Sequence, residues 1–277
     1  MQFVPSVAAP AHIEGEAYWF AFRGNELLVM HANGKPSVPV GASVTELGVN
    51  AADAHYLGAI NDKHCFSCEL DPDVALPPDL TFRNLRSLFF EFDDTLIGVA
   101  GRAFQIKEWD RTHRFCGACG ARTQMLSSER ARKCVQCGLI CYPRISPVVM
   151  VLVRRGRELL LTRKPGYAPG RYTVVAGFVE AGETLEAAVD RETAEETGVN
   201  VENIRYFACQ PWPFPHSLVI AFHAQHAGGE VRPDGVELED ARWFHYQHLP
   251  DLPEPVHVSR KLIDDAVNNL KRGSDES

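Results

Sequence analysis

The fold of the C-terminal half is decided by residues 177–199, which read GFVEAGETLEAAVDRETAEETGV. Over residues 184–197 the apolar positions recur with the period of an α-helix. At about 100° per residue, Glu192 and Glu196 fall within about 20° of Leu185, on the apolar side of this helix. Burying two carboxylates one turn apart is costly unless a cation neutralises them, and divalent cations prefer oxygen ligands. The stretch therefore predicts a strand, loop and helix that hold a divalent metal ion.

The remaining charges of the stretch agree with an inward-facing site. Glu186 and Asp190 fall on the opposite side of the helix, where a solvated helix carries its carboxylates. Arg191 lies on a flank, and we expect it to pair with Glu183 and brace the loop before the helix. Gly198 stands at the position of a C-terminal cap.

Length and composition set the wider frame. A chain of 277 residues with 45% hydrophobic residues predicts two or three folded domains and excludes a mainly disordered, collagenous or coiled-coil protein. No apolar run approaches the roughly 20 residues that span a bilayer. The first residues carry no Lys or Arg before Glu14, unlike a secretory signal. We therefore expect a soluble, cytoplasmic protein, and its net charge of −8 argues against general attraction to nucleic acid or an anionic membrane.

Changes in pattern along the chain predict three domains, with boundaries at 1–110, 111–145 and 146–277. The first contains strands and hairpins, including residues 16–22 and 26–30, and one helix near 80–90. The third has an α/β pattern. Its predicted strands are 148–153, 158–161, 172–176, 218–222 and 241–244, and its predicted helices are 184–197 and 259–270.

Four cysteines in the middle segment form two CxxC pairs that 14 residues separate: Cys116 and Cys119, then Cys134 and Cys137. This spacing predicts a zinc ribbon with one zinc ion per chain. Because protein fills all four ligand positions, the zinc is expected to stabilise the fold and not to catalyse.

The other cysteines lack this pattern. Cys65 and Cys68 form a single CxxC pair beside His64, which is half of a zinc site, and we expect reduced structural thiols. Cys141 lies outside the ribbon spacing.

The ribbon segment is strongly basic, with seven Arg and Lys residues against one acid, Glu129. Arg130, Arg132 and Lys133 are candidates for contacting the phosphates of a nucleic acid. The same charges could instead solubilise a small domain or face a phosphate-bearing substrate.

The glutamate stretch resembles the Nudix box: Gly, five residues, Glu, seven residues, then Arg-Glu-x-x-Glu-Glu-x-Gly. It departs only at Thr193, a packing position that is usually aliphatic. The resemblance implies an α/β/α sandwich with a mixed sheet and hydrolysis, dependent on Mg²⁺ or Mn²⁺, of a nucleoside diphosphate linked to a further moiety. It implies Glu192 and Glu196 as metal ligands, Glu195 as a further ligand or an aid to proton removal, and the Ala176 carbonyl as a ligand.

A proline-rich segment follows the box: Gln210, Pro211, Trp212, Pro213, Phe214, Pro215, His216 and Ser217. Alternating prolines make an extended segment whose aromatic rings either stack on a base or nicotinamide, or turn into the core of a connector. The segment is similar to the SQPWPFPxS signature of the NADH pyrophosphatase subfamily of Nudix hydrolases, with Cys209 in place of Ser. The resemblance implies substrate contacts along it.

The subfamily also has a zinc ribbon and an N-terminal α+β Nudix-like domain, so the resemblance covers nearly the whole chain. It implies substrate contacts by Tyr142 and Ser259. It implies Glu237 as a further metal ligand, although Glu239 and Asp240 stand beside it. Members form homodimers in which the partner completes the substrate pocket.

These features predict hydrolysis of NAD(H) to NMN(H) and AMP, and the same pocket could remove an NAD cap from RNA. A rival is a non-hydrolytic dinucleotide sensor whose ribbon holds nucleic acid, although a sensor has no need of the box glutamates. ADP-ribose and diadenosine polyphosphates are alternative substrates. The sequence does not choose between free NADH and capped RNA.

Overall fold

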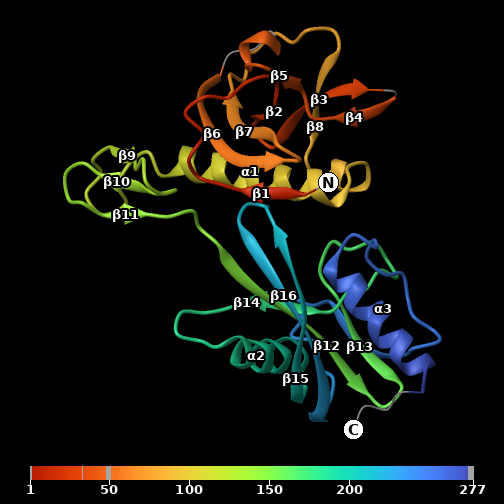
Figure 1. The fold of residues 1–277 in the computed structure, drawn as a ribbon. Helices are drawn as coiled ribbons and strands as arrows, with labels where there is room; N and C mark the ends of the chain where they lie inside the picture. Colours follow the sequence, from red (N-terminus) through yellow and green to blue (C-terminus); the bar gives the residue numbers. More distant parts are fainter. Residues whose placement is uncertain (1, 33, 48–50, 274–277) are drawn as a thin grey trace. The chain divides into compact units, whose positions relative to one another are not determined.

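The computed structural model describes residues 2–32, 34–47 and 51–273 (Figure 1). Contacts divide the chain into two compact units. The N-terminal unit comprises the residues up to Arg144 together with Pro213–His216, and the C-terminal unit comprises Ile145–Trp212 and the residues from Ser217 onward. Within the described residues, no helix has the length and apolar character that crossing a membrane requires.

The N-terminal unit is built on a mixed sheet. Its strands are β1 (Phe3–Pro5), β2 (Ala17–Arg23), β3 (Glu26–Ala32), β4 (Lys35–Ser37), β5 (Val40–Gly41), β6 (Ala51–Ile60), β7 (Lys63–Leu70) and β8 (Leu80–Asn84). Their order is β1-β6-β7-β2-β3-β4, with β5 paired to β2 and β8 to β3, and β2 runs parallel to β7. Short 3₁₀ helices lie at Thr45–Leu47 and Ser87–Phe90.

One long helix, α1 (Asp94–Thr112), packs on this sheet. The predicted helix near 80–90 is wrong, because polar and apolar residues alternate along β8, which pairs with β3. Helix α1 begins after Asp93, whose side chain accepts hydrogen bonds from the backbone N–H groups of Thr95 and Leu96. The core beneath it includes Phe20, Phe22, Leu27, Leu57, Leu85 and Phe104.

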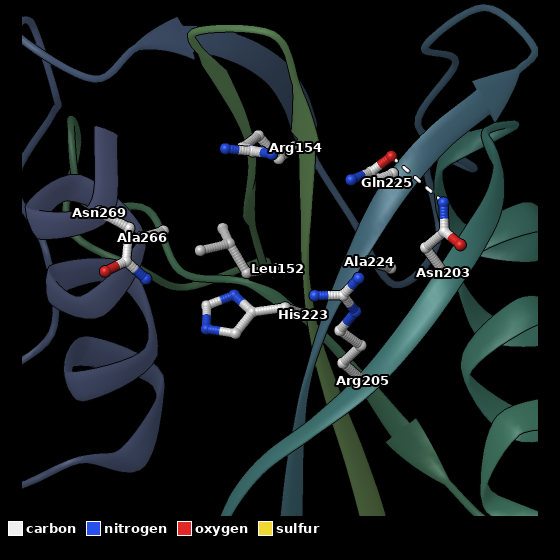
Figure 2. Close-up of a pocket in the computed structure, with 9 residues that line it drawn as sticks. All are labelled: Leu152, Arg154, Asn203, Arg205, His223, Ala224, Gln225, Ala266 and Asn269. Carbon is white, nitrogen blue, oxygen red and sulfur yellow. Dashed lines mark hydrogen bonds between the residues drawn. The ribbon is translucent and has the colours of Figure 1, made fainter. Parts of the chain in front are cut away.

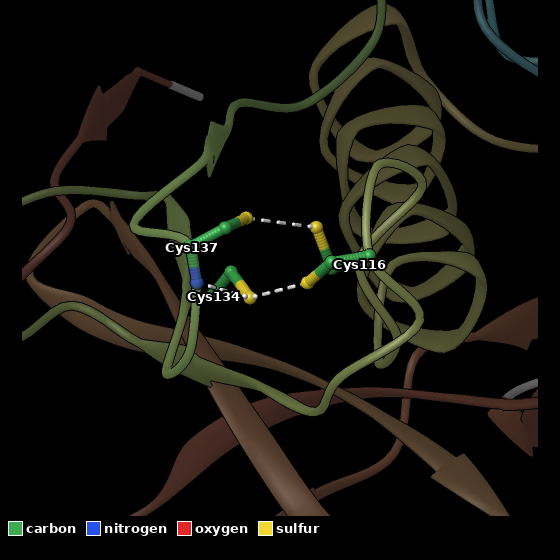
Figure 3. A group of neighbouring side chains, drawn as sticks. Cys116, Cys134 and Cys137 are labelled. Atoms are coloured by element: carbon green, nitrogen blue, oxygen red, sulfur yellow. Dashed lines mark hydrogen bonds between the residues drawn. The ribbon is translucent and has the colours of Figure 1, made fainter.

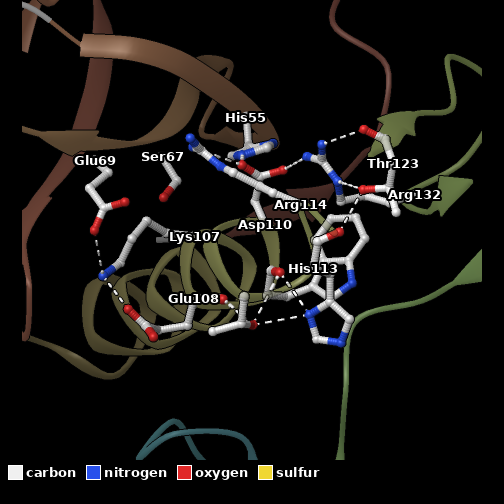
Figure 4. Close-up of polar contacts among 12 residues, drawn as sticks. His55, Ser67, Glu69, Lys107, Glu108, Asp110, His113, Arg114, Thr123 and Arg132 are labelled. Carbon is white, nitrogen blue, oxygen red and sulfur yellow. Dashed lines mark hydrogen bonds and ion pairs between the residues drawn. The ribbon is translucent and has the colours of Figure 1, made fainter. Parts of the chain in front are cut away.

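The ribbon carries three short strands, β9 (Thr123–Met125), β10 (Arg132–Cys134) and β11 (Ile140–Cys141). Asp110 of α1 fastens it to the helix (Figure 4). Its carboxylate, 6% exposed, accepts a hydrogen bond from Arg132 and lies 3.4 Å from Arg114 Nη2 and 3.7 Å from His55 Nε2. Burial alone would raise the pKa of Asp110, but these neighbours outweigh burial and lower it.

A second arginine of the ribbon also donates hydrogen bonds to groups of the protein. Arg130 Nη2 donates hydrogen bonds to the carbonyl oxygens of Tyr56 and Ser6, at 2.7 and 3.2 Å. Both arginine side chains therefore bind protein groups, which reduces the charge they can offer to a nucleic acid. Lys133 alone of the three predicted residues is exposed.

The C-terminal unit is a sandwich of a mixed sheet between two helices (Figure 1). Its elements are β12 (Ser146–Arg155), β13 (Glu158–Arg163), β14 (Val175–Phe178), α2 (Leu185–Thr197), β15 (Asn200–Trp212), β16 (Ser217–Gly228), β17 (Asp240–His245) and α3 (Val258–Lys271). The strand order is β15-β16-β12-β13-β17, with β14 paired to β12, and β12 runs parallel to β16. Successive residues of β12 pack into different hydrophobic cores. Val149 and Val151 pack with α2, and Leu152 packs with α3.

Most predicted elements of this unit are confirmed. Thr184 caps α2, its hydroxyl accepting a hydrogen bond from the N–H of Ala187, and Gly198 ends the helix at φ 74°. The strand predicted at 172–176 begins only at Val175, because Thr173 forms an isolated bridge with Thr162. The sequence analysis missed β15, whose burial pattern is irregular and whose pairing contains bulges.

Candidate functional site

The four ribbon cysteines form a ready zinc site (Figure 3). Their Sγ atoms all lie within 4.8 Å of one another, with 3.6 Å between Cys116 and Cys137 and 3.4 Å between Cys119 and Cys134. A tetrahedral zinc ion with bonds of about 2.3 Å would set its sulfur ligands about 3.8 Å apart. The observed separations are close to this value, so small shifts of the thiols would complete a zinc site.

The backbone prepares the thiols for metal binding. Both knuckles turn at a glycine in the left-handed region, Gly120 at φ 74° and Gly138 at φ 78°. The N–H groups of Cys137 and Gln136 donate to Cys134 Sγ at 3.4 Å, and these donors lower the pKa of the Cys134 thiol to about 6. The backbone donors thus favour the thiolate at Cys134, whereas hydrogen bonds with the neighbouring thiols raise the pKa of Cys137 to about 12.

A second site lies in the C-terminal unit, at a cavity of about 500 Å³ beside α2. Glu192 and Glu196 point into the protein, with relative exposures of 8% and 2%, and Glu186 and Asp190 are exposed. The predicted orientation of these four carboxylates is confirmed. Glu195 lies between the two faces, with its side chain 63% exposed and at the cavity wall.

The absence of a side chain at Gly177 leaves space for the Glu192 carboxylate. A Cβ atom at Gly177 would lie 1.9 Å from Glu192 Cδ, so the carboxylate occupies the space that any other side chain would fill. Arg191 holds the same region together. It contacts Glu183 at 2.7 Å, as predicted, and also Glu192 at 2.8 Å and Glu195 at 3.1 Å.

Glu196 has the environment that a bound cation would stabilise most. Both carboxylate oxygens are buried and have no hydrogen-bond partner in the described part of the chain. The Lys164 ammonium lies 3.7 Å from Oε1, outside hydrogen-bond range. Burial raises the pKa of Glu196 to about 7, as do the charges of Glu192, Glu237 and Asp234, and Lys164 opposes them. A buried, unsatisfied carboxylate among other carboxylates is what a divalent cation would stabilise.

Three acidic residues that lie close together in the sequence, Glu237, Glu239 and Asp240, have different partners in the structure. Glu237 lines the cavity. Glu239 pairs with Arg163 at 3.3 Å, and Asp240 accepts a hydrogen bond from Tyr172. Glu237 is therefore the acid of the three that faces the site.

Asp234 holds this loop in position. Its side chain accepts hydrogen bonds from the N–H groups of Glu237 and Leu238, and its own N–H donates to the Glu196 carbonyl at 3.2 Å. The Glu237 loop is thus tied to the end of α2. In the described residues only the cysteines gather within 4.8 Å, so the carboxylates converge less closely than the thiols.

Ala176 completes the set of predicted metal-binding groups. It lines the cavity, and its carbonyl oxygen accepts a hydrogen bond from Lys164 Nζ at 3.1 Å. Two further lining residues, Lys164 and Phe178, were missed by the sequence analysis. Lys164 belongs to no motif, and Phe178 occupies a variable position of the box.

The proline-rich segment divides its residues between two roles. Trp212 and Ser217 line the cavity of the C-terminal unit. Phe214 packs in the N-terminal unit, 6.0 Å from Phe89 and 6.1 Å from Phe104 between ring centroids, and the Arg86 guanidinium lies over its ring. Substrate contact by Phe214 therefore remains a prediction that its packing does not support.

The other residues of the segment are also placed by packing. Pro213 is buried and Pro211 exposed. Pro215 and His216 line a cavity of about 370 Å³ in the N-terminal unit. Both ends of the Gln210 amide are used internally: Nε2 donates to the Val256 carbonyl and Oε1 accepts from the Val258 N–H, each at 2.9 Å. Gln210 thus fixes the start of α3.

The two predicted substrate contacts outside the proline-rich segment, Tyr142 and Ser259, also lie outside the lining of the 500 Å³ cavity. Tyr142 belongs to the N-terminal unit, is 55% exposed, and donates its hydroxyl hydrogen to Glu129 at 3.1 Å. Ser259 is buried in the first turn of α3.

A smaller cavity, of about 90 Å³, lies between α3 and the strands of the C-terminal unit (Figure 2). Arg154, Arg205 and His223 line it, and His223 Nε2 is 3.0 Å from Asp265 Oδ2. Its lining residues include no carboxylate and none of the residues singled out from the sequence.

Cys65 and Cys68 behave as structural thiols. They lie on β7 in two different core clusters, and burial raises the pKa of each to about 12. Neither thiol is poised for metal binding.

Comparisons with known proteins agree with this arrangement. Residues 144–266 match the NUDIX domain, residues 16–109 the NADH pyrophosphatase-like rudimentary NUDIX domain, and residues 111–142 the NADH pyrophosphatase zinc ribbon domain. A Deinococcus radiodurans protein named NAD-capped RNA hydrolase NudC is 42% identical over 277 residues, which cover 99% of this chain and 95% of that protein. A Chromobacterium violaceum protein of the same name is 42% identical over 253 residues, covering 91% and 92%.

The predicted architecture is confirmed: a Nudix α/β/α sandwich follows a zinc ribbon and an N-terminal Nudix-like domain. The matches also support zinc in the ribbon and divalent-metal hydrolysis at the box. By its domains and relatives, the chain belongs to the NADH pyrophosphatase family of Nudix hydrolases.

Proposed function

We propose that this enzyme hydrolyses the diphosphate bond of NAD(H) to NMN(H) and AMP, and that it removes the NAD cap from RNA 5′ ends. Water adds across the P–O–P bridge, so each product leaves with one phosphate. The observation that carries the proposal is the buried Glu196 carboxylate, whose two oxygens have no hydrogen-bond partner in the described chain. The names of the two relatives support the substrate class.

The groups proposed to hold the catalytic cation are the Ala176 carbonyl and the carboxylates of Glu192, Glu196 and Glu237. Their oxygens suit Mg²⁺ or Mn²⁺. When bound, such an ion neutralises the diphosphate and activates water. Glu195, exposed at the cavity wall, is suited to bind a further ion or to accept a proton from the attacking water.

The proposed substrate contacts in the C-terminal unit are aromatic. Trp212 and the 59% exposed Phe178 both line the cavity and offer ring faces to a base or nicotinamide. Ser217 offers a hydroxyl at the same wall. Contacts by Tyr142 and Ser259 remain part of the proposal through the family resemblance.

The wider proposal covers organisation and location. We propose domains at 1–110, 111–145 and 146–277, a homodimer in which the partner completes the substrate pocket, and a cytoplasmic location. The family resemblance supports the dimer, and gel filtration with light scattering would measure it.

The decisive experiment compares Glu196→Gln with Glu186→Gln, because both remove one carboxylate from α2. With Mg²⁺ or Mn²⁺, the wild type and Glu186→Gln should hydrolyse NADH and NAD-capped RNA, and EDTA should abolish both activities. Glu196→Gln should lower kcat more than about 100-fold, in line with the loss of one preorganised charge interaction. Full activity of folded Glu196→Gln would refute the assignment.

A further inference from the structure

Lys164 lies beside two of the groups that the proposed function assigns to the metal ion. It follows β13, and its Nζ donates a hydrogen bond to the Ala176 carbonyl at 3.1 Å and lies 3.7 Å from Glu196 Oε1. Both oxygen atoms belong to groups that the proposed function gives to the cation. One ammonium group thus donates a hydrogen bond to one proposed metal ligand, Ala176 of β14, and forms a longer ion pair with another, Glu196 of α2.

The surrounding charges make this lysine a counterion. The charges that act most strongly on Glu196 are the carboxylates of Glu192, Glu237 and Asp234 and the ammonium of Lys164. The other nearby cation, Arg191, makes its ion pairs with glutamates of the box and not with Glu196. The Glu196 side chain is 3% exposed, so water does little to screen this imbalance.

We propose that Lys164 is an internal counterion that occupies the cation site of the metal-free protein and that a divalent ion must displace. The proposal rests on the proposed function, which supplies the metal ligands. An ammonium group beside the Ala176 carbonyl and the Glu196 carboxylate weakens the binding of a divalent cation to the same oxygens, because like charges repel at such distances.

Once a metal ion has displaced it, the Lys164 ammonium can bind the substrate diphosphate instead. Lys164 lines the 500 Å³ cavity, so a displaced Nζ remains within the space that the substrate diphosphate would enter. The diphosphate then stabilises the displaced ammonium, and the metal and the substrate assist each other's binding. Lys164 is in this sense a positioning residue that lowers metal affinity until substrate arrives.

The first test titrates Mn²⁺ into full-length, zinc-loaded protein and follows free Mn²⁺ by electron paramagnetic resonance. Lys164→Met should lower the Mn²⁺ Kd about tenfold, the ratio that about 1.4 kcal/mol of relieved repulsion gives. It should also lower the Tm of the metal-free protein and enlarge the Tm rise that Mn²⁺ causes. Arg155→Met removes the same charge from β12, at an exposed pair with Glu158, and should leave the Mn²⁺ Kd unchanged.

The second test needs no variant. Brief acetylation followed by peptide mass spectrometry measures how reactive Lys164 is in the wild type. Mn²⁺ should increase acetylation of Lys164, because displacement frees Nζ from its two oxygen partners, and should leave Lys261 unchanged. An Mn²⁺ Kd in Lys164→Met that equals or exceeds the wild-type value, or acetylation that Mn²⁺ does not increase, would overturn the proposal.

Glu196→Gln separates this failure from failure of the proposed function. If Mn²⁺ binds the wild type and Glu196→Gln equally well, the metal site itself is misassigned. If Glu196→Gln loses Mn²⁺ but Lys164→Met binds as the wild type does, only the role of Lys164 is wrong.

Discussion

Replacing Gly177 by alanine places a methyl group where the Glu192 carboxylate now lies. The new Cβ would be 1.9 Å from Glu192 Cδ and 2.1 Å from each carboxylate oxygen. The backbone at Gly177 lies outside the left-handed region, so the substitution adds no backbone strain. The clash is with the end of a flexible side chain, and Glu192 can relieve it only by leaving the site.

The two consequences differ in size. For stability, the main loss is the Arg191–Glu192 hydrogen bond at 2.8 Å, and a bond to a charged group contributes about 1.5–3 kcal/mol. At about 2–4 °C per kcal/mol, the Tm should fall by less than about 12 °C. For catalysis, displacing one preorganised charge should lower kcat about 10²–10³-fold. Gly177→Ala should therefore remain folded and be nearly inactive.

The assay measures NADH hydrolysis at saturating Mn²⁺ beside a thermal melt of the same sample. Gly98→Ala is the matched control, since its Cβ meets no atom within 4 Å and its backbone is helical. That variant should keep wild-type kcat and gain slightly in Tm, because alanine favours the helix. Wild-type kcat in Gly177→Ala would show that the position of Glu192 does not matter to catalysis.

Three further predictions concern the ribbon, the aromatic segment and pH. Cys116→Ser should reduce the zinc content and lower the Tm, because zinc binding is coupled to folding; less than half an equivalent of zinc in purified wild type would contradict this. Phe214→Ala should destabilise the fold by about 3 kcal/mol through lost packing. Trp212→Ala should weaken turnover of both NADH and capped RNA by about 1–3 kcal/mol through lost stacking, and unchanged turnover in that variant would contradict its proposed role. Because the folded pKa of Asp110 lies below the usual value of 3.8, its stabilising contribution is complete above that value and is lost as the pH falls through the folded pKa. Chemical denaturation should therefore show that the free energy of unfolding falls more steeply with decreasing pH in the wild type than in Asp110→Asn. Parallel curves for the two proteins would show that the Asp110–Arg132 contact does not cause the acid sensitivity.

Local patterns were enough to predict the box helix and the zinc knuckles. Helix faces repeat every three to four residues, so the direction of Glu192 and Glu196 follows from their spacing alone. A CxxC turn likewise brings two thiols together through its own backbone. These features depend on residues a few positions apart, and tertiary contacts did not change them.

Features that depend on distant partners needed the tertiary structure. The sequence placed a helix near 80–90, but residues 80–84 pair with β3 as a strand and only Ser87–Phe90 form a short 3₁₀ helix. The sequence also did not predict that Trp212 lines the cavity, whereas Phe214 packs against the core of the N-terminal unit. In an extended segment, the environment of each side chain is set by the elements that pack against it, and those lie far away in the chain.

Charge was the property least readable from sequence. Arg130 and Arg132 look like a free basic surface until Tyr56, Ser6 and Asp110 are seen to bind them. Lys164 belongs to no motif, yet folding brings it to Glu196. The chain order specifies which charges exist, whereas the fold decides which are paired, because electrostatic energy depends on separation and burial that only the packed structure defines.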